Sequence, residues 1–435
     1  MQRLDGLLQP QLRMIRNSEV PVSQTRSRSP RLSRALAVFG PGIVVMLADT
    51  DVGSIITAGQ SGAQWGYRLL LLQVVLIPIL YMVQELTVRL GIFTGRGHGE
   101  LIRDTFGGFW AWVSVAGLAV ATFGALVTEL AGVAGIGELY GVHRAVSLTV
   151  ATVALLAVVM SGSYRRVERV AIALGLFELA FFVVAWWAHP SVAEMATQAV
   201  EIPFREKEYL YLAAANIGAV IMPWMVFYQQ SAVADKGLRP EHLGAARIDT
   251  AVGAVITQLV MAAVLVAVAA TLGKSDPEFS LKTVGEMSGV LTPFLGDGFG
   301  KLVFSAGVLG AGMIAAIVST LALAWGVGEV AGFKRSLNLQ PSQARGFYGL
   351  YAAAVVVCAV LVGLYPNLVD LNVGVQVMNA LLLPVVLGFL IALSMRALPP
   401  AVRLRGPYLW VLLVVVGLTT ALGVFGGLQG IGLVG

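Results

Sequence analysis

The sequence predicts an all-α integral membrane protein of about eleven transmembrane helices, and three observations support this prediction. The composition is 57% hydrophobic and only 12% charged, whereas soluble domains carry roughly a quarter charged residues. Apolar stretches long enough to cross a bilayer recur along the whole chain. Lys and Arg are grouped between these stretches, which is the pattern that orients membrane proteins. The net charge of +5 therefore indicates topology and not a nucleic-acid partner.

Eleven stretches have the length of roughly 17 to 25 residues, or more, that a membrane helix needs. They cover 36–62, 68–93, 110–138, 145–162, 168–189, 209–234, 246–272, 300–331, 346–365, 369–395 and 408–429. A cytoplasmic N-terminus places most of the 29 Lys and Arg on the cytoplasmic side, as the positive-inside rule requires. Residues 1–34 hold seven arginines and no apolar stretch, which predicts a disordered cytoplasmic tail. We expect a multi-pass protein of the plasma (inner) membrane, surrounded by the lipid bilayer.

The first and sixth stretches are each interrupted near the middle by residues that disfavour a continuous helix. The first contains Asp49-Thr50-Asp51-Val52-Gly53-Ser54, and the sixth contains Met222-Pro223-Trp224. Corresponding interruptions in two halves are typical of transporters built from inverted repeats, with the substrate site between the breaks. We predict one five-helix repeat over 35–190, a second over 209–396, and a peripheral eleventh helix at 408–429.

Asp51 is the strongest indication of function, because a carboxylate at mid-membrane costs about 2.5 to 3.5 kcal/mol on insertion scales. Where the helix unwinds, free backbone carbonyls can bind a cation together with this carboxylate. A structural role is compatible with this one, since Asp51 could cap the helix that follows it. Asp49 lies two residues earlier and could face elsewhere, either as a vestibule residue that attracts cations or as a structural partner.

The sixth stretch offers two further ligands. Pro223 lacks an N–H and frees a carbonyl such as that of Ala219, and Met222 supplies a thioether. Oxygen donors suit Mg²⁺ and Mn²⁺, whereas sulfur suits softer transition metals. Gln376 in the tenth stretch is a further oxygen donor, or else it forms a hydrogen bond between helices.

Other residues of the spans leave alternatives open. Glu129 could be a proton relay, a vestibule charge or a residue paired within the bundle, and Gln229 could line an exit path. The single cysteine, Cys358, excludes a disulfide framework and a cysteine-based metal site. The histidines lie in loops or at the ends of spans, which removes the usual neutral-pH proton shuttle. They are His98, His143, His189 and His242.

Two parts of the chain resemble the Nramp divalent-metal transporters. One runs from Gly40-Pro41-Gly42 through the first break to the segment 84–95, QELTVRLGIFTG, and the other is the segment 218–223, GAVIMP. The resemblance implies a LeuT-type fold and alternating access, with the metal as substrate and with no cofactor and no enzymatic activity. The metal ligands that it implies are the side chains of Asp51, Ser54, Met222 and Gln376 and the carbonyls of Ala48 and Ala219.

The departures from the family pattern point to one branch. Val52 stands where the first motif has proline, Ser54 where it has asparagine, and Trp224 where a histidine follows Met-Pro. Of an acidic pair in the third span only Glu129 remains, and the ninth span lacks the family's arginines. The chain therefore looks most like the Nramp-related magnesium transporters, which are thought to move Mg²⁺ and Mn²⁺ without protons. We expect Asp49, Trp224, Glu129 and Gln229 to line the vestibule or to support the ligands.

Two features of the site favour different metals. The short Ser54 enlarges the site, and Mg²⁺ retains its water readily, whereas the soft sulfur of Met222 favours Mn²⁺ or Fe²⁺. We expect import of Mg²⁺ and Mn²⁺ by a monomer, without proton coupling. The alternatives are a proton-coupled Mn²⁺/Fe²⁺ importer of the Nramp family and, in second place, an organic-solute symporter of the same fold.

Overall fold

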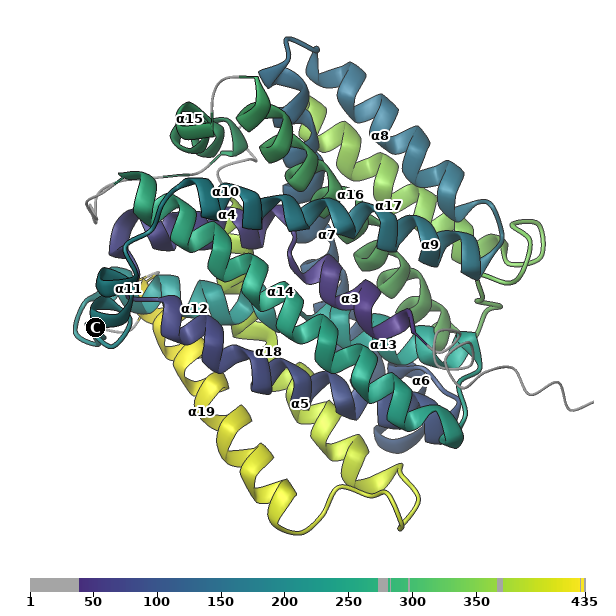
Figure 1. The fold of residues 1–435 in the computed structure, drawn as a ribbon. Helices are drawn as coiled ribbons and strands as arrows, with labels where there is room; N and C mark the ends of the chain where they lie inside the picture. The colour runs from purple at the N-terminus through teal and green to yellow at the C-terminus, as the bar shows by residue number, and fades with distance from the viewer. Residues whose placement is uncertain are drawn as a thin grey trace, which may run out of the picture. The chain divides into compact units, whose positions relative to one another are not determined.

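The protein is all-helical wherever the computed structural model describes it. The described residues are 39–272, 281, 283–295, 298–365, 371–430 and 432–433, and no strand occurs among them. The predicted cytoplasmic tail, 1–34, lies outside these residues. Figure 1 shows the described helices in their order along the chain, from purple to yellow.

Nine helices within the described residues are long and apolar enough to cross a membrane. Three of them contain an interruption or a change of helix type: α9 (Tyr164–Gly175) continues through η1 (Leu176–Leu179) into α10 (Ala180–Trp187), α12 (Lys207–Val220) into α13 (Pro223–Lys236), and η2 (Pro240–His242) into α14 (Leu243–Leu272). The others are α5 (Leu70–Thr94), α7 (Gly108–Leu139), α16 (Phe299–Ala331), α17 (Arg345–Leu364), α18 (Asn372–Arg396) and α19 (Pro407–Gly430).

A bent pair of helices, α3 (Pro41–Asp49) and α4 (Val52–Trp65), provides a tenth span among the described residues. The remaining predicted span corresponds to α8 (Arg144–Val159), which has 16 residues and is short for a membrane helix. The count of eleven therefore stays a prediction. Short helices lie between the spans: α6 (His98–Phe106), α11 (Val192–Gln198) and α15 (Val284–Leu295).

The predicted break in the first span is confirmed, and Asp51 is the reason for its position. The axes of α3 and α4 differ by 48°. Asp51 has an extended backbone (φ −74°, ψ 170°), and its carboxylate accepts a hydrogen bond from the backbone N–H of Ser54. This is the geometry of a helix N-cap, so a new helix begins at Val52.

The predicted break in the sixth span is confirmed as well. Helix α12 ends at Val220 and α13 begins at Pro223, with Met222 extended between them (φ −96°, ψ 144°). Proline favours the first position of a helix and cannot continue a preceding one. Pro223 therefore both ends α12 and starts α13.

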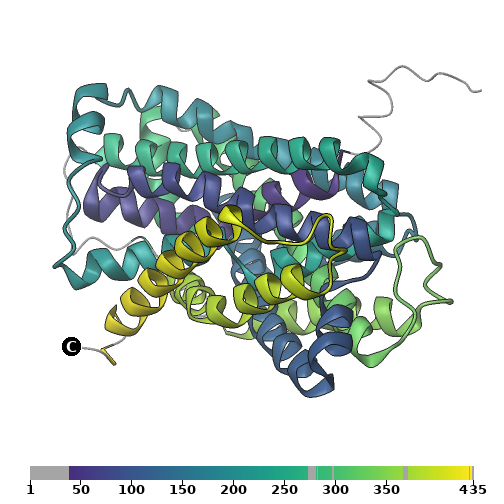
Figure 2. The same ribbon diagram turned by 90° about the horizontal axis from the view of Figure 1, so that it is seen from below.

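The two broken spans are surrounded by other helices. Helix α14 runs beside α3 and α4 (Figure 1), and α18 packs against α12 and α4. The contact between α12 and α18 requires glycine, because a Cβ on Gly218 would overlap the carbonyl of Gln376 and lie 2.7 Å from the backbone nitrogen of Ala380. Helix α19 lies against α12 and α18 (Figure 2). The boundaries of the two predicted repeats stay a prediction.

Candidate functional site

Asp51 lies at the first break with one carboxylate oxygen fully bonded and the other free. Its Oδ1 accepts hydrogen bonds from the backbone N–H of Ser54 at 2.6 Å and from Nε2 of Gln376 at 3.2 Å. Its Oδ2 has no hydrogen-bond partner among the described residues, although Asp51 is fully buried. A buried, unpaired carboxylate oxygen is costly, so this oxygen is suited to a cation or a proton.

The carbonyl of Ala48 is released by the same break. In a continuous helix the N–H of Val52 would bind the carbonyl of Ala48. It instead donates to Oε2 of Glu129 at 3.1 Å. Glu129 therefore stabilises the start of α4 from the neighbouring α7, and it leaves the end of α3 with an available acceptor.

The carbonyl of Ala219 is released at the second break, as the sequence predicts. Pro223 has no N–H to donate to it. The hydroxyl of Ser54 donates to this carbonyl at 3.1 Å. This hydrogen bond joins the two breaks directly, and it places the N-terminus of α4 next to the C-terminus of α12.

Met222 is fully buried at the start of α13. Two helix N-termini, of α4 and α13, and two C-termini, of α3 and α12, thus belong to the two joined breaks. Free carbonyls at helix C-termini carry a partial negative charge that favours a cation. The thioether of Met222 adds a soft donor.

Gln376 is oriented by a second amide. Its Oε1 accepts a hydrogen bond from Nδ2 of Asn379 at 2.9 Å, while its Nε2 faces Asp51. In this arrangement Gln376 positions the carboxylate of Asp51. A rotation of the amide by half a turn would direct Oε1 of Gln376 toward the site instead.

The groups at the two breaks could bind a cation with few charged ligands. Within the described residues no group of three or more His, Cys, Asp or Glu could hold a metal ion. The donor set would combine one carboxylate with carbonyl, hydroxyl, amide and thioether groups.

The comparison with known proteins identifies the family. Residues 42–429 match the family model described as "Natural resistance-associated macrophage protein-like", Nramp. The chain belongs to the Nramp family. One relative in this family is the "Divalent metal cation transporter MntH" of Erwinia tasmaniensis, which is 29% identical over 313 residues that cover 69% of this chain and 74% of the relative.

Solved structures show the fold of this Nramp chain. A manganese transporter of Eremococcus coleocola, in complex with an aromatic bis-isothiourea substituted compound, superposes with a TM-score of 0.74 at 18% identity, over 93% of this chain and 89% of that one. A Na⁺-coupled sialic acid symporter in a substrate-bound outward-open state superposes with a TM-score of 0.55 at 14% identity, over 90% and 89% of the two chains. The LeuT-type fold with discontinuous first and sixth helices is thereby confirmed.

The remaining predicted residues of the Nramp chain lie at different places around the breaks. Trp224 is fully buried, and its Nε1 has no hydrogen-bond partner among the described residues. Gln229 lies about two turns along α13, with its amide bonded to Thr87 at 2.9 Å and to Thr250 at 2.8 Å. Asp49 faces α14, where Nε2 of Gln258 donates to it at 3.5 Å. Their vestibule or supporting roles stay predictions.

All ten predicted site residues are almost completely shielded from solvent. None exceeds 1% exposure, which means that the structure has the site closed on both sides. The ten are Ala48, Asp49, Asp51, Ser54, Glu129, Ala219, Met222, Trp224, Gln229 and Gln376.

Several residues near the breaks were not identified from the sequence. Asn379 lies one helical turn after Gln376, and this spacing could have identified it. Glu178 is a carboxylate within the apolar fifth span, so the argument applied to Asp51 also applies to it. Thr257 and Gln258 give no such signal, because uncharged polar residues are common in membrane helices.

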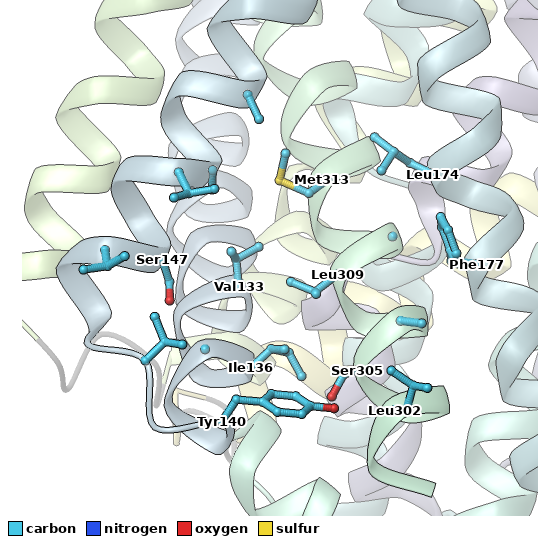
Figure 3. Close-up of a pocket in the computed structure, with 18 residues that line it drawn as sticks. Val133, Ile136, Tyr140, Ser147, Leu174, Phe177, Leu302, Ser305, Leu309 and Met313 are labelled. Carbon is cyan, nitrogen blue, oxygen red and sulfur yellow. The ribbon is translucent and has the colours of Figure 1, made fainter. Parts of the chain in front are cut away.

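Two cavities lie apart from the breaks. One, of about 650 Å³, lies between α7, α8, α9 and α16, and apolar side chains such as Leu174, Phe177 and Met313 line it (Figure 3). The other, of about 670 Å³, is formed by the ends of α4, α12, α18 and α19 and is more polar, with Gln60, Gln64, Lys207 and Glu208 in its lining. Only the second has the polarity that an ion path needs.

Proposed function

We propose that this Nramp chain imports divalent metal cations, Mg²⁺ and Mn²⁺, across the plasma membrane by alternating access. Asp51 is the charged ligand. The proposal rests on its buried Oδ2, which has no partner among the described residues and lies at the junction of the two broken spans. The names of the relatives, a divalent metal cation transporter and a manganese transporter, give the same class of substrate.

The ligands proposed beside Asp51 are Ser54, Met222, Gln376 and the two released carbonyls, of Ala48 and Ala219. The hydroxyl of Ser54 and one carbonyl already face each other. Gln376 becomes a ligand when its amide rotates. When the amide of Asn379 rotates with it, Nε2 of Gln376 donates to Oδ1 of Asn379, which has no partner among the described residues.

A polar line along α4 supplies the outer half of the route. Ser54, Thr57, Ser61 and Gln64 follow one another at three- and four-residue spacing, which places them on one face of the helix. Gln64 lines the 670 Å³ cavity. With the N-terminus in the cytoplasm, as the distribution of Lys and Arg favours, this cavity opens outward and the route leads inward to Asp51.

Proton-independent transport is the second part of the proposal. Trp224, directly after Met222-Pro223, carries no titratable group. Glu129 holds the N–H of Val52 and receives the hydroxyl of Thr128 at 3.2 Å, so its carboxylate has a structural task. Together these features favour the magnesium branch of the family.

One observation favours the alternative, a proton-coupled importer of Mn²⁺ or Fe²⁺. Met222 keeps a soft sulfur at the break, and sulfur is a poor ligand for Mg²⁺. An organic-solute symporter is less favoured. The carboxylate of Asp51 at the junction would repel the carboxylate group that such solutes often carry.

Metal uptake with simultaneous pH recording tests both parts. Proteoliposomes that contain the full chain receive Mg²⁺ or Mn²⁺, and fluorescent indicators report the metal and the internal pH. We expect saturable uptake of both metals without acidification. Acidification in step with Mn²⁺ entry would establish the proton-coupled alternative.

A matched pair of variants tests the role of Asp51. Asp51→Asn keeps the shape and removes the charge, so uptake should fall to the background of empty vesicles. Asp104→Asn makes the same exchange in α6, where Asp104 is 39% exposed, and should leave uptake unchanged. Uptake by Asp51→Asn at the wild-type rate would exclude Asp51 as the charged ligand.

A further inference from the structure

A second group of buried acids lies on the other side of the first break. Asp49, at the end of α3, is 1% exposed, and Glu178, in η1, is fully buried. Glu178 lies within electrostatic range of Asp49 and close to the hydroxyl of Thr50. Oγ1 of Thr50 lies 2.6 Å from Oγ1 of Thr257 in α14. One compact cluster therefore contains two carboxylates and two hydroxyls.

The local structure directs Glu178 into this cluster. Its span changes from α-helix to a 3₁₀ turn at Leu176–Leu179, a change that often marks a functional position. The preceding residues, Leu176 and Phe177, are more than half exposed, and Phe177 points into the apolar cavity of Figure 3. The acid is thus the residue of the turn that faces the interior.

The cluster has too few hydrogen-bond donors for its acceptors. The hydroxyl pair supplies two protons, and one of them lies between the two oxygens. The other can serve only one of the two carboxylates, Asp49 beside Thr257 or Glu178 beside Thr50. The amide of Gln258 donates to Oδ2 of Asp49 at 3.5 Å. Oδ1 of Asp49 and both carboxylate oxygens of Glu178 have no hydrogen-bond partner among the described residues.

Gln258 provides an independent sign of a ligand. It is 1% exposed, and while its nitrogen faces Asp49, its Oε1 has no partner among the described residues. Buried amide oxygens are normally satisfied. Several unsatisfied oxygens at one place, from an amide and from two carboxylates, lack an electron-pair acceptor, and one metal cation can fill that role for all of them at once.

The charge of the two acids is also unbalanced. Neither Asp49 nor Glu178 forms a salt bridge within the described part of the chain. The strongest further charges that act on Glu178, those of Asp51 and Glu129, are also acidic. A buried double negative charge is strongly unfavourable, and one divalent cation would neutralise it.

We propose that the residues Asp49, Thr50, Glu178, Thr257 and Gln258 form a second site for a divalent cation with hard, oxygen-preferring character. Carboxylate, hydroxyl and amide oxygens are the donors that such ions take. The site is separate from that of Asp51, whose carboxylate faces Ser54 and Gln376. The evidence for this second site comes from its own residues, and the proposal does not depend on transport through the Asp51 site.

Binding stoichiometry tests this proposal without any transport. The purified full chain in detergent is equilibrated with Mn²⁺, and the bound metal is counted by equilibrium dialysis with elemental analysis. We expect two Mn²⁺ for each wild-type chain. Glu178→Gln and Gln258→Leu, on two different helices, should each retain one, and Asp51→Asn should also retain one, at the second site.

Matched controls distinguish a loss of metal at either site from a loss of folding. Glu194→Gln makes the same exchange in the exposed helix α11 and should retain two Mn²⁺. Each variant is compared with wild type by thermal unfolding, so that a loss of metal is read only from folded protein. Binding in Glu178→Gln and Gln258→Leu that equals binding in wild type, whether one or two Mn²⁺, overturns the second site. A single Mn²⁺ in wild type that Asp51→Asn retains and Glu178→Gln loses supports the second site and contradicts metal binding at Asp51. Two Mn²⁺ in wild type, with one in Asp51→Asn and one in Glu178→Gln, supports both sites.

Discussion

Nε2 of Gln376 donates to Oδ1 of Asp51 across 3.2 Å, and this bond joins α18 to the break between α3 and α4. It leaves Oδ2 as the oxygen of Asp51 that can receive a cation. Because Asn379 holds the other end of the same amide at 2.9 Å, two residues of α18 support the orientation of the carboxylate that the N–H of Ser54 also holds. The tenth span, which contains neither break, thus contributes to the geometry at the first break.

The first prediction concerns this control. Gln376→Ala removes the donor and a candidate ligand, and a hydrogen bond to a charged group is worth about 1.5 to 3 kcal/mol. We expect the KM for Mn²⁺ uptake to rise by about tenfold or more, with the protein still folded. Uptake kinetics in proteoliposomes measure the change. Asn379→Ala should give a smaller increase in KM, because it acts through Gln376; an equal KM for Gln376→Ala and wild type would refute the role of α18.

The breaks could be predicted from sequence because their causes are local. Asp51 caps the helix that follows it, and Pro223 must end one helix and can start another. Both effects depend on the residue type and its immediate neighbours. The same holds for the carbonyl of Ala219, since a missing N–H four residues later can be read directly from the chain.

The partners across helices could not be predicted in this way. The bonds of Val52 to Glu129 and of Asp49 to Gln258 join residues 77 and 209 positions apart. They depend on how α7 and α14 pack, which hydropathy does not determine. Glu178 is different, because an acid in an apolar span is visible in the sequence; only its neighbours require the structure.

The second prediction concerns the contact between α12 and α18. Gly218→Ala would place a methyl group against the backbone of Gln376 and Ala380, and backbone cannot move aside as a flexible side chain can. Overpacking of this kind costs typically 1 to 3 kcal/mol, so both the unfolding temperature and uptake should fall. Gly374→Ala is the matched control, because no atom lies within 4 Å of the added Cβ. Equal unfolding temperatures for the two variants would contradict the close packing.

The third prediction concerns His98, at the start of α6 and outside the membrane spans. Burial lowers the pKa of His98 to about 4, although its hydrogen bond to Gln230 opposes the shift. Because Oε1 of Gln230 can only accept, Nδ1 of His98 is the donor at 2.9 Å. The unfolded chain has a histidine pKa of about 6.5. Between pH 6.5 and 4 it therefore binds more protons than the folded chain, and stability must fall as the pH falls.

The measurement for His98 is the unfolding temperature at pH 7 and pH 5. Wild type should lose roughly 2 kcal/mol of stability from this group over that range. His98→Gln should lose correspondingly less, because glutamine does not titrate. His143→Gln, at an exposed histidine, should behave as wild type. The same pH dependence in His98→Gln and wild type would mean that other groups cause it.

The last prediction concerns the start of α3, which Asp249 of α14 holds in place. Oδ2 of Asp249 accepts hydrogen bonds from the backbone N–H groups of Gly40 at 3.2 Å and Gly42 at 2.8 Å. If α3 must move to open the site on the side of the N-terminus, these bonds oppose the movement. Asp249→Ala removes both and should favour the open state, since each bond to a carboxylate is worth about 1.5 to 3 kcal/mol.

Labelling of an introduced cysteine measures this opening. Cys358→Ser removes the single native thiol, and Ala48→Cys, at a fully buried position of α3, reports access for a membrane-impermeant maleimide. Asp249→Ala should raise the labelling rate at least about tenfold, and Asp249→Asn should raise it less, because its amide oxygen still accepts hydrogen bonds. Asp235→Ala is the control, since Asp235 accepts from the N–H of Leu337 and does not hold α3. Equal labelling in Asp249→Ala and the control would show that α3 is held by other contacts, of which Lys236 with the carbonyl of Phe39 is the next to test.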